Sequence, residues 1–185
     1  MIFYIKTMSD YRPLTLEEID TLSQNDCWAE DWERVMVADG FRPYAFHRVM
    51  FYGDIRLGEF EKMVAVSEGF NKHSGINNAT LRNVTIGDNC LIENVHNYIH
   101  NYDIGDETYI SNVCTIETTE GATYGDGQLV SVLNEAGEGN VVAYHGLTSQ
   151  LAALMVRHSS DKLFRQAIHR LISEEVRLST PERGM

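Results

Sequence analysis

The densest group of chemically capable side chains in this sequence lies between Glu93 and Tyr102. These ten residues include two histidines, three asparagines and two tyrosines. An imidazole with an ordinary pKa of about 6.5 accepts a proton near neutral pH. We therefore single out His100, which we expect at an outward-facing turn, as the candidate catalytic residue. The candidate substrate-binding residues around it are His96, Asn94, Asn97 and Asn101.

Other common site chemistries have little support. Cys27, Cys90 and Cys114 are an odd number of cysteines without CxxC spacing, which favours reduced thiols over a disulfide or zinc framework. No serine lies in a nucleophile elbow, and no glycine-rich segment continues as Gly-Lys-Ser or Gly-Lys-Thr. We predict no metal site and no bound cofactor.

An internal repeat predicts which elements position these residues. Ile86-Gly87-Asp88 with Ile92, Asn94 and Val95 recurs eighteen residues later as Ile104-Gly105-Asp106 with Ile110, Asn112 and Val113. A period of six lies inside the eighteen. Its bulky positions are Ile86, Ile92, Tyr98, Ile104, Ile110 and Ile116.

A period of six suits neither a helix nor a hairpin. It suits strands of three or four residues, each followed by a two-residue turn, and three such strands complete one turn of a coil. Residue i then lies over residue i+18, so that Asp88 lies over Asp106 as a repeated Gly-Asp turn and His96 lies inward over Cys114. We also expect the pattern to continue at residues 124–131. The predicted fold is an all-β solenoid with helical caps.

The repeat resembles the hexapeptide-repeat, LpxA-like acyltransferase superfamily over residues 76–133. The segment Ile99-His100-Asn101-Tyr102-Asp103-Ile104-Gly105 is similar to that family's I-A-H-N-x-x-I-G motif, although Ile99 replaces the small alanine. The resemblance implies a left-handed parallel β-helix with His100 as general base. It also implies a homotrimer, because relatives in that superfamily place their sites between the coils of neighbouring subunits. It further implies transfer of an acyl group from a coenzyme A or acyl carrier thioester to an amine or hydroxyl of a nucleotide-sugar. The whole chain also resembles part of a larger bacterial family of unassigned function.

Two other functions stay open. One is a non-catalytic scaffold or assembly module built on the same β-helix. The other is a zinc hydratase similar to the γ-class carbonic anhydrases, with His73 as a third ligand beside His96 and His100. That class requires three converging imidazoles, and the separation of His96 from His100 is one residue too short for its motif.

The flanking segments predict caps. Thr15 and Glu18 form a capping box at the start of a short helix. Residues 26–39 are compatible with a helix or with a loop entering a strand at residues 34–37, and we favour the loop and strand. Apolar residues at helical spacing predict two helices, at residues 149–158 and 161–177. The expected segments are an N-terminal cap (1–45), the β-helix (46–147) and C-terminal helices (148–185).

Composition limits the classes of partner. The 185 residues contain 15 Lys and Arg against 27 Asp and Glu, a formal net charge of −12. Such a chain is a poor match for nucleic acid. No apolar run approaches the roughly 20 residues that span a bilayer, and no secretory signal is evident. We expect a cytoplasmic protein that binds a small molecule.

Overall fold

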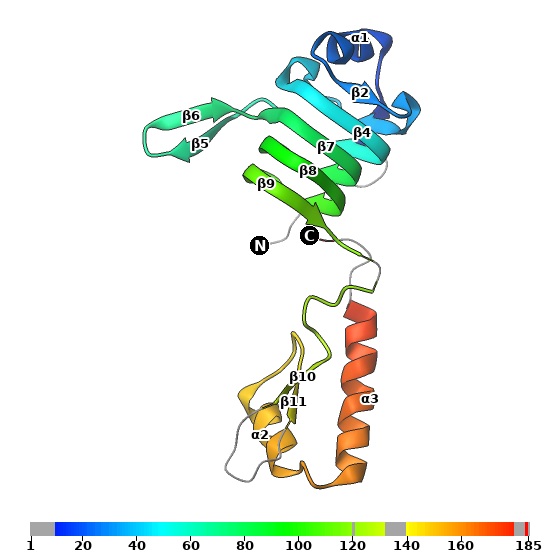
Figure 1. Ribbon diagram of the computed structural model, residues 1–185, viewed down its shortest axis with the longest axis vertical. Helices are drawn as coiled ribbons and strands as arrows, with labels where there is room; N and C mark the ends of the chain where they lie inside the picture. Colours follow the sequence, from blue (N-terminus) through cyan, green and yellow to red (C-terminus); the bar gives the residue numbers. More distant parts are fainter. Residues whose placement is uncertain (1–9, 120, 132–139, 180–183, 185) are drawn as a thin grey trace. The chain divides into compact units, whose positions relative to one another are not determined.

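The computed structural model describes residues 10–119, 121–131, 140–179 and 184. The chain divides into two compact units, one of residues 1–119 with 183–185 and one of residues 120–182 (Figure 1). Each unit has its own hydrophobic core. In the described part of the chain, no helix combines the length and apolar character that a membrane span requires.

Unit 1 is built on a seven-stranded sheet. Its strand order is β1-β3-β4-β7-β8-β9, with β2 also paired to β4. The strands are β1 (Arg12–Pro13), β2 (Trp28–Ala29), β3 (Val35–Val37), β4 (Phe46–Leu57), β7 (Gly75–Ile86), β8 (Leu91–Ile104) and β9 (Tyr109–Glu117). The pair β1–β3 is antiparallel and the other pairs are parallel. β3 confirms the strand expected after the loop.

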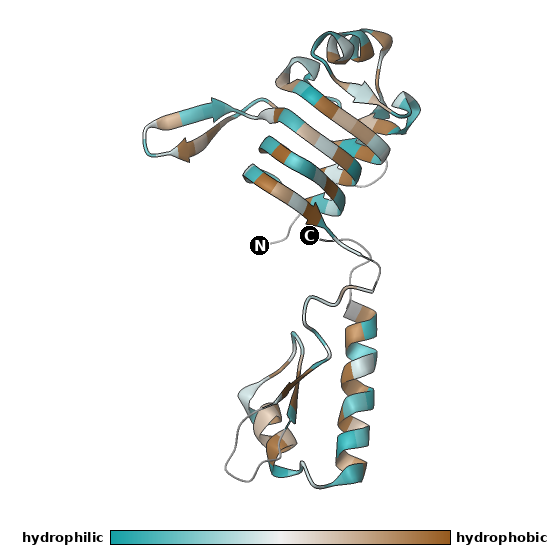
Figure 2. Cartoon of the chain, viewed as in Figure 1, coloured by the Kyte–Doolittle hydropathy of each residue, from teal (hydrophilic) through white to brown (hydrophobic). Residues whose placement is uncertain are grey.

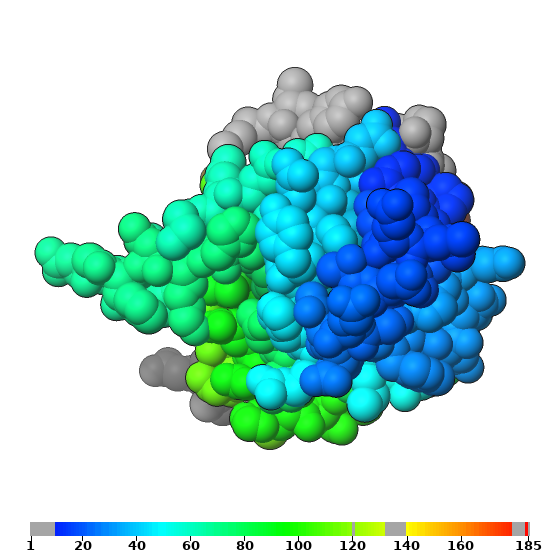
Figure 3. All heavy atoms as spheres, turned by 90° about the horizontal axis from the view of Figure 1, so that it is seen from above, coloured from blue at the N-terminus to red at the C-terminus, as the bar shows by residue number. Residues whose placement is uncertain are grey.

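Short elements complete unit 1. Helix α1 (Leu16–Gln24) begins with the predicted capping box, in which Thr15 Oγ1 accepts from the Glu18 N–H and the Glu18 side chain accepts from the Thr15 N–H. Two 3-10 turns, η2 (Trp32–Arg34) and η3 (Pro43–Ala45), precede β3 and β4. A separate antiparallel hairpin of β5 (Met63–Ser67) and β6 (Phe70–His73) stands clear of the sheet in Figure 3.

The core of unit 1 follows the alternation of the long strands. Ile76 and Ile92 are paired neighbours on β7 and β8, and both are fully buried. Polar residues alternate with such positions, as the change of colour along each strand in Figure 2 shows. Ile86 pairs with Ile104 and Ile92 with Ile110. The predicted offset of eighteen residues is therefore confirmed at these positions.

Asparagine allows the long strands to bend. Asn78 and Asn83 in β7, Asn94 and Asn101 in β8, and Asn112 in β9 all have φ between 50° and 56°. This left-handed region is costly for most L-residues, and asparagine tolerates it better than most. The strands can therefore change direction without ending.

The prediction of an all-β solenoid, and of a left-handed parallel β-helix, was wrong. The described residues form a sheet of mixed parallel and antiparallel pairs, two separate two-stranded sheets and three α-helices. The repeat led us to expect strands of three or four residues, whereas β7 and β8 are 12 and 14 residues long. Periodicity in the sequence indicates which residues alternate and which form turns, but it does not predict which strands pair antiparallel with β1, β5 and β10.

A change of phase in β8 explains a second error. Ile92 and Val95 are three residues apart and both are buried, so the alternation changes phase at the bend of Asn94 between them. The register with β9 shifts by one residue further along, between Val95 and Tyr98. Ile99 is fully buried, at the inward position that we assigned to Tyr98. We expected His96 to lie inward over Cys114, but His96 is exposed.

Unit 2 contains β10 (Gln128–Ser131), β11 (Asn140–Ala143), α2 (Ser149–Arg157) and α3 (Lys162–Ser179). The two helices confirm the predicted helical segments. β10 pairs antiparallel with β11, so the repeat does not continue through residues 124–131 as expected. β11 shares a core with the two helices, through Val142, Met155 and Ile172. The expected segments 1–45, 46–147 and 148–185 stay a prediction.

Candidate functional site

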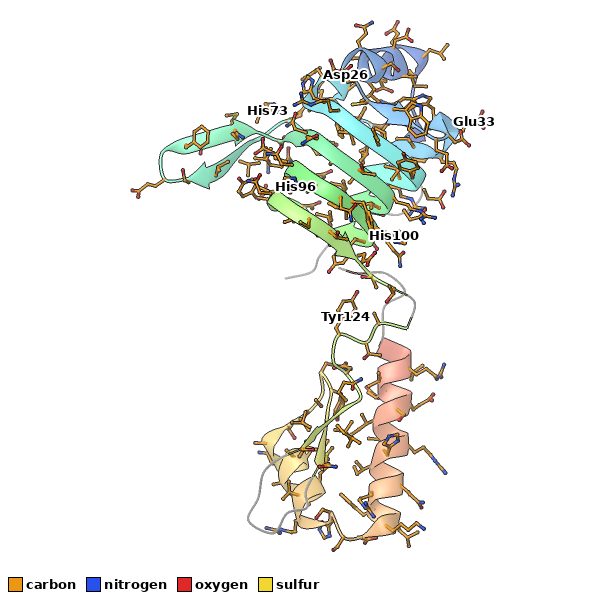
Figure 4. The ribbon with its side chains drawn as sticks, in the orientation of Figure 1. Asp26, Glu33, His73, His96, His100 and Tyr124 are labelled. Carbon is orange, nitrogen blue, oxygen red and sulfur yellow. The ribbon has the colours of Figure 1, made fainter. Side chains whose placement is uncertain are left out.

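Three polar residues lie in one row across the sheet. Arg82 on β7 pairs with His100 on β8, and His100 pairs with Glu117 on β9. Paired residues on neighbouring strands, about 4.8 Å apart, face the same side. Leu81 and Ile99 directly precede Arg82 and His100 and are buried. Arg82 and His100 therefore point outward. We call Arg82, His100 and Glu117 the polar row, of which Figure 4 labels His100.

Tyr98 joins the polar row from β8. Its hydroxyl donates to Glu117 Oε2 at 2.9 Å, and its ring lies edge-on to His100 with 6.4 Å between centroids. The hydrogen bond to the Glu117 carboxylate raises the pKa of Tyr98, because ionisation of the phenol would place two negative charges together. Tyr98 is thereby held as a neutral donor.

The row can carry out limited chemistry. The half-buried His100 imidazole can accept a proton from an amine or hydroxyl, and the Arg82 guanidinium can attract an anionic group. Glu117 places a carboxylate on the neighbouring strand, at the position paired with His100. The candidate catalytic residue therefore has charged neighbours from two other strands.

Asn94 has a structural role. Its Nδ2 donates to Asn112 Oδ1, and its Oδ1 accepts from Asn78 Nδ2, both at 3.3 Å. All three asparagines have left-handed backbone conformations. They form a ladder that holds together the bends of β7, β8 and β9.

The other two candidate asparagines are also engaged with neighbouring chain. Asn97 Nδ2 donates to Thr115 Oγ1 at 3.1 Å. Asn101 Nδ2 donates to the Thr118 carbonyl at 3.3 Å, and the Asn101 carbonyl accepts from the Gly184 N–H at 3.1 Å. Of the two, Asn97 is the more exposed.

The histidines are not gathered into one site. Figure 4 shows His96, His100 and His73 well apart, with His73 at the base of the hairpin. Within the described residues there is no group of three or more His, Cys, Asp or Glu side chains that suits a metal ion. The zinc-hydratase alternative therefore has no donor set in the described part of the chain.

Sequence reasoning missed Arg82 and Glu117. Arg82 lies eighteen residues before His100, so the repeat offset could have identified it. Glu117 lies seventeen residues after His100, because the extra residue in β8 changes the offset. No periodic signal in the sequence could have revealed that change.

A second feature is the outer edge of β9. Among the described strands, β9 is the last of the sheet and no further strand pairs with it. A Cβ added at Gly58 or Gly87 would meet the backbone of the next turn at 2.7 Å, whereas one at Gly105 would meet nothing within 4 Å. The last turn thus has the Gly-Asp pair of the earlier turns, and no described residue packs against Gly105 on the side where a Cβ would lie.

The apolar residues of β9 are incompletely covered. Ile92, Val95 and Ile99 on β8 are buried, and their partners on β9 are only partly buried. Those partners are Ile110, Val113 and Ile116. β9 contains one charged residue, Glu117, and no lysine or proline. Natural edge strands usually carry such residues to prevent pairing with another chain.

Comparison with known proteins gives a family without an assigned activity. The family model described as "Domain of unknown function (DUF4954)" matches residues 11–185. A protein of Treponema pallidum (strain Nichols), described as "Uncharacterized protein", is 29% identical over 176 residues. That alignment covers 89% of this chain and 24% of the relative, so the chain spans about a quarter of the relative's length. No solved structure matches.

These matches correct the resemblance to the hexapeptide-repeat, LpxA-like superfamily, which was wrong. The family that matches over residues 11–185 is a different one. The I-A-H-N-x-x-I-G likeness rests on a short segment around His100. A short segment of this kind is weak support for an activity, because unrelated proteins share short motifs.

Proposed function

The chain belongs to the DUF4954 family, since that family's model matches residues 11–185, and we propose that its sheet is an assembly module in which two copies of the chain join along β9. The observation that supports this proposal most directly is the unfinished edge of β9. Ile110, Val113 and Ile116 are only partly covered there, and β9 has a single charged residue, Glu117, at its end.

The second copy is the favoured occupant because, among the described strands, β9 is the long edge strand of the sheet. It has nine residues, whereas β1, at the other edge, has two. Figure 1 places β2 and α1 at the far end of the sheet from β9. Two copies can therefore form a longer ladder β9 to β9 than β9 to β1. A two-fold arrangement of this kind closes on itself and gives a dimer.

The spacing on β9 is self-complementary in an antiparallel pair. Centred on Val113, the register places Ile110 opposite Ile116 of the second copy and Val113 opposite itself. Tyr109 then lies opposite Glu117, so no like charges face each other across the pair. This matters for a chain with a formal net charge of −12.

Analytical ultracentrifugation over a range of concentrations tests the proposal. We expect a species of twice the chain mass of 21.0 kDa. Val113→Lys places two ammonium groups opposite each other and should weaken the dimer by about tenfold or more. Val130→Lys makes the same change at an exposed strand valine in unit 2 and should leave the mass unchanged.

Cys114 offers a readout that does not depend on a folded Val113 variant. It is an exposed residue of β9, and pairing should slow its alkylation as the protein concentration rises. A monomer at every concentration, with a constant alkylation rate, overturns the proposal. A trimer supports the homotrimer expected from the sequence and contradicts the two-fold pairing.

A second candidate function is acyl transfer at the polar row. It is favoured by the placement of His100 between Arg82 and Glu117. In this proposal His100 takes a proton from an acceptor amine or hydroxyl, whose lone pair attacks a thioester carbonyl. The C–S bond breaks, and the thiolate leaves and takes a proton from the imidazolium. Coenzyme A or an acyl carrier would be the donor and a nucleotide-sugar the acceptor.

Release of coenzyme A from acetyl-coenzyme A, followed with a thiol reagent across a panel of amino and hydroxy sugars, tests this second candidate. The signal from exposed Cys114 is subtracted with a sample lacking acceptor. His100→Asn should reduce turnover by a factor of about 100 or more. His47→Asn, at an exposed histidine of β4 outside the polar row, is the matched control and should retain turnover. Equal turnover in the two variants contradicts the role of His100.

A further inference from the structure

Unit 2 contains a cavity that neither proposed function uses. It has a volume of about 660 Å³ and lies among β10, β11, α2 and α3. Small-molecule sites in proteins commonly measure about 300–1,000 Å³. The cavity is therefore large enough for a small ligand, and all of its lining residues belong to unit 2.

One side of the cavity is apolar. Val142 and Met155 are 7% and 4% exposed, and both belong to the core of unit 2. Phe164 and Ile168 on α3 extend this lining and are partly buried. An aliphatic chain placed here would be removed from water, which favours binding in proportion to the apolar area covered.

The other side of the cavity presents a cation. Arg165 and His169 lie four residues apart on α3, so their side chains share one face of the helix. Within the described residues, Arg165 forms no salt bridge. Ser159 and Ser160 add two hydroxyl groups to the lining. This set suits a carboxylate or a phosphate, which a guanidinium binds through paired hydrogen bonds.

The local charge agrees with an anionic ligand. Residues 157–170 contain four of the chain's 15 Lys and Arg residues and one acidic residue, Asp161. Asp161 Oδ1 accepts from the N–H groups of Leu163 and Phe164 and so caps α3. In a chain with a formal net charge of −12, this segment is a local region of positive charge.

We propose that this cavity binds a small anionic amphiphile, a molecule with an aliphatic chain that ends in a carboxylate or a phosphate. The aliphatic chain of the ligand lies against Val142, Met155 and Ile168. The anionic head lies at Arg165 and His169. Binding does not depend on the β9 pairing or on the polar row, because both belong to unit 1.

Isothermal titration calorimetry on the full chain tests this site. Dodecanoate and dodecyl phosphate, each below its micelle concentration, should both bind. Dodecyltrimethylammonium and dodecanol, which lack the negative charge, should bind at least about tenfold more weakly. Inorganic phosphate, which lacks the chain, should also bind at least about tenfold more weakly. Equal binding of a cationic or neutral amphiphile, or of inorganic phosphate, overturns the proposal.

A matched pair of variants locates the head group. Arg165→Gln should weaken dodecanoate binding by about tenfold, whereas Arg170→Gln, on the same helix but outside the cavity lining, should change it by less than about twofold. Equal weakening in both variants indicates general attraction of anions and contradicts the site.

A chain-length series locates the tail. From octanoate to dodecanoate, affinity should rise several-fold with each added methylene, because each is buried against apolar residues. Affinity that does not depend on chain length overturns the proposal. Binding to vesicles of anionic phospholipid without binding to monomeric dodecanoate also overturns it, since that result indicates a membrane surface as the ligand.

Discussion

The Asp106 side chain holds the turn of the preceding strand, since its Oδ1 accepts from the Asp88 N–H at 2.7 Å. Asp88 repeats this contact one turn earlier, where its Oδ1 accepts from the Glu59 N–H at 2.8 Å. Each aspartate of the Gly-Asp pairs therefore links its own turn to the one before. The pairs are structural, as expected from the repeat, and not a catalytic pair of carboxylates.

Asp106→Ala should destabilise unit 1. The change removes a charge-assisted hydrogen bond, and we expect a loss of about 1–2 kcal/mol in the free energy of unfolding. Urea unfolding followed by tryptophan fluorescence measures unit 1 alone, because both tryptophans, Trp28 and Trp32, belong to it. Asp106→Asn keeps an acceptor oxygen and should lose less. An alanine variant as stable as the original chain contradicts this role.

Gly87 and Gly105 occupy the same position in successive turns but should respond differently to alanine. A Cβ at Gly87 would meet the Asp106 backbone nitrogen at 2.7 Å and the Gly105 carbonyl carbon at 2.9 Å. We expect Gly87→Ala to cost about 1–3 kcal/mol, the usual penalty for overpacking. Gly105→Ala meets nothing within 4 Å and should be close to neutral. The same urea titration measures the free energy of unfolding of both variants. Equal losses of stability in Gly87→Ala and Gly105→Ala contradict the open space at Gly105.

The repeat predicted pairing better than architecture. Identical residues eighteen apart identified Ile86 and Ile104 as neighbours, because stacked turns place like residues together. Capping chemistry identified the start of α1 from Thr15 and Glu18, because those contacts are local in sequence. Neither signal describes how β1 finds β3, since an antiparallel partner twenty or more residues away leaves no periodic trace.

The candidate site was predicted only in part. His100 was identified by its residue type and outward position, and it does face outward beside charged groups. Asn94 and Asn101 lie at bends with positive φ, a position that asparagine tolerates, and their binding role stays a prediction. His96 is exposed beside the buried Val95, after the bend at Asn94, and composition carries no information about such a bend.

Glu18 should give unit 1 a specific sensitivity to acid. The hydrogen bond from Arg12 lowers the pKa of Glu18. A carboxylate whose folded pKa is lowered stabilises the fold above its unfolded pKa of about 4.3, and this contribution is lost as the pH falls through the folded pKa. Glu18→Gln should therefore be less stable at pH 6, with the difference shrinking below pH 4.3. Melting temperatures between pH 3 and 6 measure this.

The matched control for that experiment is Glu17→Gln. Glu17 is exposed and lies beside Glu18 in the first turn of α1, but no ion pair to it occurs in the described residues. Its substitution should change the melting temperature little across the same pH range. A parallel loss of stability in both variants would show that general charge, rather than the Arg12 contact, controls the acid response.

The three cysteines should react in a fixed order. Burial raises the pKa of Cys90 to about 11, and burial also raises the pKa of Cys27, so both stay as thiols at pH 8. Cys114 is exposed. Iodoacetamide at pH 8 should modify Cys114 first, and Cys27 and Cys90 only when urea unfolds unit 1. Peptide mass spectrometry identifies the modified residue, and early labelling of Cys90 contradicts its burial.

Unit 2 should be removable without loss of the sheet. Unit 1 contains residues on both sides of unit 2 in the sequence, and two consecutive carbonyls of β8 hold them. The His100 carbonyl accepts from the Thr118 N–H at 3.3 Å, and the Asn101 carbonyl accepts from the Gly184 N–H at 3.1 Å. The chain thus leaves and rejoins unit 1 at neighbouring positions, as an inserted domain does. Replacing residues 120–182 by a short Gly-Ser linker should keep the urea midpoint of the tryptophan signal. Gly184→Val, which would meet the Tyr102 ring and Thr118 Oγ1, should lower that midpoint in the full chain. If the shortened protein loses its cooperative transition, unit 1 depends on residues 120–182 and the insertion model fails.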